Sequence, residues 1–121
     1  LLTEPRLFQT YLLGSPSFWF ADGVIDSFED AYAKKNERLD ATVLLYVGGL
    51  EISRYDLARK GNTRDMVAGM EAFVSRLGGR SYGGLRLDST VIPDKDHRSS
   101  VRPGFAWAVK EALPPPVAAS P

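Results

Sequence analysis

Two residues of this chain have the chemistry and the spacing of an acid–base pair. His97 is the only histidine, and it lies in a polar loop directly after the expected strand 85–92. Glu51 follows the apolar segment 42–47 after a short turn that contains two glycines. A carboxylate beside an imidazole fixes the tautomer of the ring and stabilises the imidazolium. His97 and Glu51 are therefore candidate catalytic residues, provided that the fold brings the ends of the two segments together.

One pentapeptide, Gly79 to Gly83, has the form G-x-S-x-G with Ser81 at its centre. A nucleophile elbow needs a strand before this motif and a helix after it, because only that order holds the serine on a sharp turn beside an oxyanion hole. Here the pattern predicts a helix before the motif and a strand after it. The glycines that end the expected helix explain the match, so we do not expect Ser81 to be a nucleophile.

A second group of residues follows the first apolar segment. Ser17, Phe18 and Trp19 come directly after a turn, and Phe20 extends the aromatic run. Aromatic side chains at the end of a strand can line a substrate pocket, although packing under a neighbouring helix is their commoner fate. No metal or cofactor site is expected, because the chain has one histidine, no cysteine and no carboxylates at a recognisable ligand spacing.

Strands and helices alternate along the chain. Short apolar or alternating segments closed by turn residues predict strands, and apolar stripes at helical spacing predict helices. The expected strands are 8–13, 42–47 and 85–92. The expected helices are 23–39, 64–77 and 102–113, with Asp22 as the cap of the first and Thr63 as the cap of the second. This β-α-β-α-β-α order predicts a three-layer α/β fold with a small parallel sheet. The first strand lacks alternation, so we expect it to be buried on both faces.

Composition narrows the class of protein. The 121 residues carry 15 basic and 15 acidic side chains, so the net charge of zero argues against a nucleic-acid partner. The apolar runs are far shorter than the ~20 residues that span a bilayer. We expect one domain over residues 1–113 and a tail rich in proline and alanine over 114–121. Because the chain opens at Leu1 without methionine, we expect a fragment of a longer protein.

Three landmarks in this order resemble a family of α/β hydrolases. They are the S-P-S-x-W stretch at 15–19, the strand end and acid at 47–51, and the histidine loop at 92–103, which is similar to a G-x-H-x-S-V-x-P pattern. Together they resemble the C-terminal half of esterase D-like and enterochelin (siderophore) esterase-like enzymes. The chain has Asp96 where a glycine is common before the histidine.

The resemblance implies roles for individual residues. His97 matches the catalytic general base, and Glu51 matches the position of the triad acid. Asp94 and Asp96 stay open as alternative carboxylates, and some enzymes of this kind use a Ser–His dyad alone. The nucleophilic serine would lie upstream of Leu1.

The expected function is that of a C-terminal fragment of a serine carboxylic-ester hydrolase, with little activity alone. Its partners would be a small-molecule ester and the N-terminal half of the same fold, or a second copy in self-association. The alternative is a non-catalytic α/β binding domain. A receiver-like regulatory domain ranks last, because the first strand does not end in a carboxylate cluster. The identity of the ester and a cytoplasmic, periplasmic or secreted location stay open.

Overall fold

The computed structural model describes residues 1–52 and 64–113. Its elements alternate along the chain as the sequence predicts. In chain order they are β1 (Thr10–Gly14), the short 3-10 helix η1 (Phe20–Asp22), α1 (Val24–Ala33), β2 (Arg38–Gly48), α2 (Met66–Gly79), β3 (Gly83–Ile92) and α3 (Val101–Ala112).

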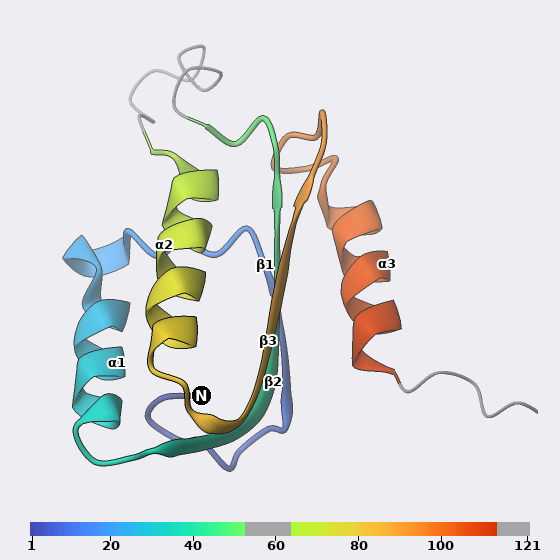
Figure 1. Ribbon diagram of the computed structural model, residues 1–121. Coiled ribbons are helices and arrows are strands. Elements are labelled where there is room, and N and C mark those ends of the chain that lie inside the picture. The colour runs from blue at the N-terminus through green and yellow to red at the C-terminus, as the bar shows by residue number, and fades with distance from the viewer. Residues whose placement is uncertain (53–63, 114–121) are drawn as a thin grey trace, which may run out of the picture.

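The three strands form one parallel sheet in the order β1-β2-β3. Helices α1 and α2 lie on one face of the sheet, and α3 covers the other (Figure 1). A parallel sheet needs a crossover between successive strands, and here α1 and α2 supply it. The predicted three-layer α/β fold is confirmed.

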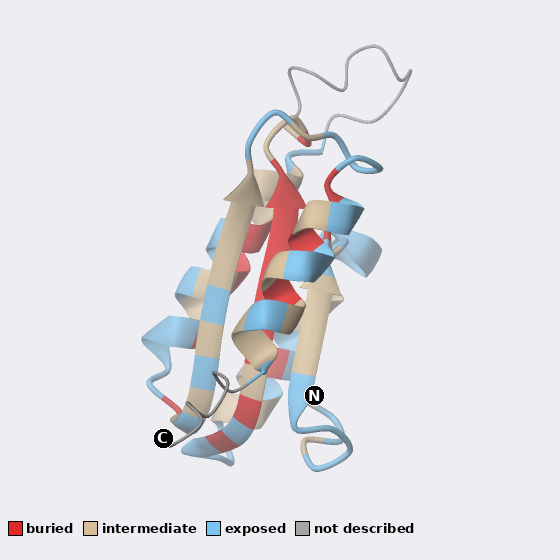
Figure 2. Ribbon diagram, turned by 90° about the vertical axis from the view of Figure 1, so that its right-hand side faces the viewer, coloured by how far each residue is buried: buried red, intermediate tan, exposed pale blue. Residues whose placement is uncertain are grey.

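The core is built around β2, which is the buried central strand (Figure 2). Residues of β2 alternate between the two faces of the sheet. Val43, Leu45 and Val47 belong to the cluster that β2 shares with α2. Leu44 and Tyr46 belong to the cluster on the α3 side. The strand is therefore apolar from Val43 to Val47, where both of its faces are covered.

The predicted helix over 23–39 is too long. The helix α1 ends at Ala33, and β2 already begins at Arg38. The side-chain amide of Asn36 donates to the carbonyl of Tyr32 at 2.9 Å and closes the helix end. The spacing of Leu39 fits the apolar stripe of a helix, but in the structure Leu39 is a buried residue of β2.

The helix caps also differ from those expected. The residue before α1 is Gly23, in the left-handed conformation, and none of the described side chains caps the helix there. Asp22 belongs to η1 instead. At α2 the cap is Asp65, whose carboxylate accepts from the backbone N–H of Ala68 at 2.8 Å. Thr63 and the tail at 114–121 lie outside the described residues.

Strand β1 is less buried than its sequence suggests. Its three apolar residues, Tyr11, Leu12 and Leu13, are only half-buried, and within the described residues the strand pairs with β2 alone. The expectation of burial on both faces is wrong for this strand, because it lies at the edge of the sheet. The strand that fits that description is β2.

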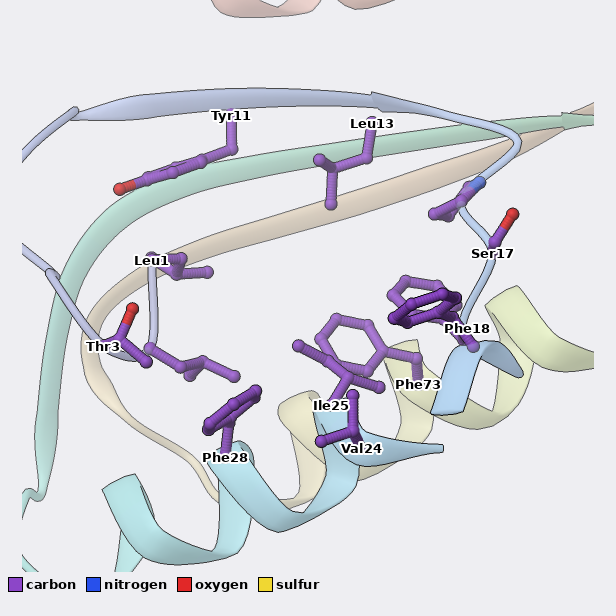
Figure 3. Close-up of a pocket in the computed structure, with 13 residues that line it drawn as sticks. Leu1, Thr3, Tyr11, Leu13, Ser17, Phe18, Val24, Ile25, Phe28 and Phe73 are labelled. Carbon is purple, nitrogen blue, oxygen red and sulfur yellow. The ribbon is translucent and has the colours of Figure 1, made fainter. Parts of the chain in front are cut away.

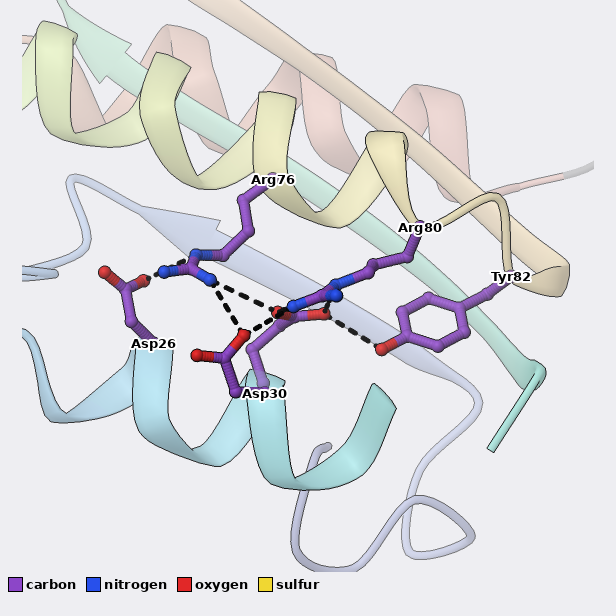
Figure 4. Close-up of polar contacts among 6 residues, drawn as sticks. Asp26, Asp30, Arg76, Arg80 and Tyr82 are labelled. Atoms are coloured by element: carbon purple, nitrogen blue, oxygen red, sulfur yellow. Dashed lines mark hydrogen bonds and ion pairs between the residues drawn. The ribbon is translucent and has the colours of Figure 1, made fainter. Parts of the chain in front are cut away.

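A buried carboxylate ties α1 to α2 and β3 at the amino end of the sheet. Glu29 is fully buried and accepts from the guanidinium of Arg80 and from the hydroxyl of Tyr82 at 2.9 Å (Figure 4). Burial, the hydrogen bond to Glu29 and its charge raise the pKa of Tyr82 to about 12. Arg76 and Asp30 extend the network. A buried charge is tolerated when it is paired and hydrogen-bonded, as here.

Candidate functional site

The ends of β2 and β3 meet at one edge of the sheet, and backbone hydrogen bonds join the loops that follow them. The N–H of Gly49 donates to Ile92 at 2.9 Å, and the N–H of Leu50 donates to Lys95 at 2.9 Å. Gly48 has no room for a side chain, because a Cβ there would meet the backbone oxygens of Lys95 and Asp96. The turn that carries the acid is therefore packed directly on the loop that carries the histidine.

This contact brings His97 and Glu51 together. The Nδ1 atom of His97 lies 2.8 Å from Oε2 of Glu51, across 46 residues of sequence. An ionised carboxylate only accepts, so the ring carries its proton on Nδ1 in the neutral form. The Glu51 side chain is 5% exposed, whereas that of His97 is 61% exposed. The pair thus has a buried acid and an accessible ring whose Nε2 is free of the acid.

Three donor groups surround the second oxygen of Glu51. Its Oε1 accepts from the Ser15 hydroxyl at 2.7 Å and from the Gly48 N–H at 2.8 Å. The Ser100 hydroxyl lies 3.4 Å away. Sequence reasoning missed Ser15 and Ser100 as members of this site. For Ser15 a signal exists, because a small polar residue directly after the first strand must reach the same edge of a parallel sheet as Glu51.

The alternative carboxylate, Asp96, accepts hydrogen bonds from groups within its own loop. Its Oδ1 accepts from the backbone N–H groups of Arg98 and Ser99 and from the Ser99 hydroxyl, at 2.8 to 3.0 Å. These bonds form the turn that carries His97 into α3. Asp94 precedes this turn with a φ of +54°. Of the three candidate carboxylates, Glu51 is the one whose hydrogen bond to the imidazole is seen.

Ser81 lies at the other end of the molecule. It falls between the end of α2 and the start of β3, so the helix precedes it and the strand follows it. Strand β3 spans 10 residues, which corresponds to about 30 Å between the edge near Ser81 and the edge near His97. This separation excludes a direct proton transfer between Ser81 and His97, as the order of the elements predicts.

Of the aromatic residues that follow β1, one packs against α2 and another lies partly at the surface. Phe18 stacks on Phe73 of α2, with ring centroids 4.2 Å apart. Trp19 is 42% exposed, and its indole N–H lies 3.4 Å from the sulfur of Met66. The guanidinium of Arg64 lies 3.4 Å above the Trp19 ring.

An apolar pocket of about 460 Å³ opens between β1, α1 and the N-terminal residues (Figure 3). Ser17 and Phe18 line one end of it, while Leu1 and Tyr11 lie toward the other. The pocket runs beneath β1 alongside α1, and Glu51 and His97 are not among its lining residues. Two of the three predicted substrate-pocket residues therefore border a cavity.

No helix within the described residues is long and apolar enough to cross a membrane. In the same part of the chain, histidine, aspartate and glutamate side chains form no group of three that is arranged to hold a metal ion.

Comparison with known proteins shows that other solved structures share this fold. Neither a protein-family model nor a curated protein matches the sequence. Among solved structures, the IroE-like serine hydrolase from Shewanella oneidensis matches with a TM-score of 0.72 at 18% identity, over 92% of this chain and 34% of its own. The siderophore hydrolase EstB from Aspergillus nidulans matches with a TM-score of 0.68 at 25% identity, over 96% of this chain and 45% of its own.

A third match, the siderophore hydrolase EstA from Aspergillus nidulans, has a TM-score of 0.72 at 20% identity and covers 93% of this chain and 42% of its own. The chain thus spans less than half the length of each of these structures. The resemblance predicted from the three sequence landmarks is confirmed by these neighbours. The chain has the fold of part of an α/β hydrolase, and the three solved structures named above are described as a serine hydrolase and two siderophore hydrolases.

Proposed function

We propose that this chain is the C-terminal part of a serine hydrolase of carboxylic esters, in which His97 is the general base and Glu51 the acid that orients it. The observation that carries the proposal is the 2.8 Å contact between His97 Nδ1 and Glu51 Oε2. Its position at the carboxyl edge of the sheet, where α/β folds bind ligands, supports it. The names of the similar structures, one serine hydrolase and two siderophore hydrolases, support the reaction class.

The proposed chemistry uses Nε2, the ring nitrogen that does not contact Glu51. A serine outside this chain attacks the ester carbonyl, and Nε2 of His97 takes the hydroxyl proton. The tetrahedral intermediate collapses when the imidazolium returns that proton to the leaving alcohol. Water then attacks the carbonyl of the acyl-enzyme and gives a proton to Nε2, and the imidazolium returns that proton to the serine oxygen as the carboxylic acid leaves. Glu51 keeps Nε2 turned toward the substrate and stabilises the imidazolium in both steps.

The substrate class that we propose is a small-molecule ester, with siderophore esters among the candidates. Ser17, Phe18 and Trp19 would border its acyl or aromatic portion. This assignment is supported by their place after the carboxyl end of β1 and by the apolar cavity that Ser17 and Phe18 line.

The proposal also assigns a partner to the free side of β1. The rest of the hydrolase fold would pair with this strand and cover the apolar pocket beside it. Two observations support this: β1 is an edge strand with half-buried apolar residues, and the chain spans only 34% to 45% of the three structures that it matches. The nucleophile and the oxyanion hole would come from that part.

A serine-reactive fluorophosphonate probe tests the proposal. We expect the full-length protein to be labelled on a serine outside residues 1–121, and the isolated chain to remain unlabelled. The His97→Asn variant of the full-length protein should lose ester hydrolysis while it keeps its fold, as judged by circular dichroism. An adduct on Ser81 would contradict the assignment of the nucleophile. Full activity in the His97 variant would favour the non-catalytic binding domain.

A further inference from the structure

The oxygen of Glu51 that faces away from His97 is reached by a hydroxyl from a third element of the fold. Ser15 Oγ donates to Glu51 Oε1 at 2.7 Å, which is the shortest of the bonds to that oxygen. Ser15 lies just beyond β1, 36 residues before Glu51, and it is only 8% exposed. A bond from a buried hydroxyl to an ionised acceptor is among the stronger hydrogen bonds in proteins.

The backbone at this point favours a residue without a side chain. Ser15 has a φ of +43°, in the left-handed region that glycine adopts without strain and other residues adopt at a cost. Its N–H donates to the carbonyl of Tyr46 at 2.8 Å, so β1 stays bonded to β2 up to the turn into Pro16. A serine therefore occupies a position whose backbone suits glycine, and the bond from its hydroxyl to Glu51 offsets the strain.

The other two donors near this oxygen, from Gly48 and Ser100, do not fix the orientation of the Glu51 carboxylate by themselves. The N–H of Gly48 lies in the turn that also holds Glu51, so it fixes one direction only. The Ser100 hydroxyl has a single hydrogen, and it lies 3.2 Å from the carbonyl of His97 and 3.4 Å from Glu51. Among the described residues, Ser15 is thus the side chain with a short bond to Oε1. With Oε1 fixed from two sides, Oε2 is turned toward Nδ1 of His97.

We infer that Ser15 is a positioning residue of the proposed hydrolase, holding the Glu51 carboxylate so that it orients His97. The inference rests on the proposed function, because it assigns to Ser15 an effect on catalysis through Glu51 and His97. Ser15 itself touches neither the ester nor the reacting atoms.

Two substitutions at one position separate positioning from stability. Ser15→Ala and Ser15→Gly both remove the hydroxyl, but only the glycine variant relieves the strain at positive φ. In the full-length protein we expect both variants to lower kcat by about tenfold, the equivalent of one charge-assisted hydrogen bond, with KM changed by less than about twofold. The glycine variant should melt at a higher temperature than the alanine variant. Activity that follows the melting temperature, with the glycine variant near wild type, would overturn the inference.

The single histidine provides a readout that needs no catalysis. In the full-length protein with ¹⁵N confined to residues 1–121, the two ring nitrogens of His97 report which of them carries the proton. We expect Nδ1–H to dominate in the wild-type neutral ring, and the ratio of Nε2–H to Nδ1–H to rise about threefold to tenfold in Ser15→Gly. An unchanged ratio would show that Glu51 is oriented without Ser15.

The same set of variants tells the two failures apart. If His97→Asn abolishes hydrolysis while both Ser15 variants keep wild-type kcat and tautomer ratio, only the positioning inference fails. If His97→Asn keeps wild-type hydrolysis, the proposed function fails. The tautomer ratio of Ser15→Gly then still decides whether Ser15 orients the pair.

Discussion

The pairing of one carboxylate with one imidazole is the central feature at the scale of single residues. Glu51 is buried and bonded through both of its oxygens, and His97 is exposed and bonded to Glu51 through Nδ1. This asymmetry suits a pair in which the acid stays fixed while the ring meets substrate. Ser15 and Gly48 complete the fixed half.

Glu51→Gln in the full-length protein should therefore lower kcat/KM by about 10³ to 10⁴, since an amide in place of the carboxylate selects the wrong tautomer and removes the charge that stabilises the imidazolium. Hydrolysis of a p-nitrophenyl ester measures this. Asp94→Asn is the matched control, because asparagine accepts the positive φ of this exposed position. We expect it to keep its rate within about threefold. A loss in the Asp94 variant comparable to that of Glu51→Gln would reassign the acid.

At the scale of elements, the site depends on how closely two loops approach. The turn after β2 lies against the backbone of the histidine loop, and hydrogen bonds from Gly49 and Leu50 lock the two together. The parallel register of β2 and β3 brings their carboxyl ends level. The position of His97 is thus set by backbone contacts, and its own loop is shaped by Asp96.

The adjacent glycines of this turn offer a matched pair of substitutions. Gly48→Ala would place a Cβ 2.9 Å from the backbone oxygen of Asp96, and the bonded loop cannot move aside cheaply. We expect urea unfolding to show a loss of about 1 to 3 kcal/mol. Gly49→Ala would place its Cβ 3.4 Å from the oxygen of Ile92, an ordinary contact, so its change should stay within about 1 kcal/mol. Equal effects of the two substitutions would argue against the close approach as the cause.

At the scale of the whole molecule, the two ends of the sheet carry different groups of polar residues. The carboxyl end carries the candidate site, and the amino end carries the network around Glu29, which joins α1, α2 and β3. Among the described residues, the long apolar side chains of Phe8, Phe20 and Phe28 remain exposed. The half-buried edge strand β1 adds to the surface that lacks cover.

Alkaline pH should weaken the network at the amino end. The folded-state pKa of Tyr82 is raised to about 12, above its ordinary value of 10, so the folded chain holds this proton more tightly than the unfolded chain does. The contribution to stability is complete below about pH 10 and is lost as the pH rises through about 12, with a size of about 2 kcal/mol. Denaturant unfolding between pH 9 and 12 measures the loss. Tyr82→Phe should remove this part of the pH dependence, while Tyr32→Phe should keep most of it.

The uncovered surface predicts association of the isolated chain. An edge strand with unpaired backbone groups and adjacent apolar side chains tends to pair with another chain. Sedimentation velocity on the 121-residue chain should show dimers or larger species, and co-expression of the remaining part of the proposed hydrolase should convert them into one defined complex. A monomer that melts in a single sharp transition would be the contrary result.

The local pattern of the sequence by itself determined much of the architecture of this protein. Apolar or alternating segments closed by turn residues predicted the three strands, the alternation of strands and helices predicted the parallel sheet, and the reversed order of helix and strand around Ser81 excluded an elbow there. The parallel arrangement also predicted that Glu51 and His97 end on the same edge. Each of these inferences needs only the chain order and the periodicity of nearby residues.

Tertiary structure decided the features that depend on contacts between distant segments. Leu39 fits a helical stripe in sequence, yet it belongs to β2 because the sheet buries it. The half-burial of β1 follows from its place at the edge of the sheet, which its own residues do not encode. The bond from Ser15 to Glu51 joins residues that are 36 positions apart in the sequence. Ser15 also has a positive φ, which the residue type serine does not predict. Long-range packing sets such contacts, so only the folded chain reveals them.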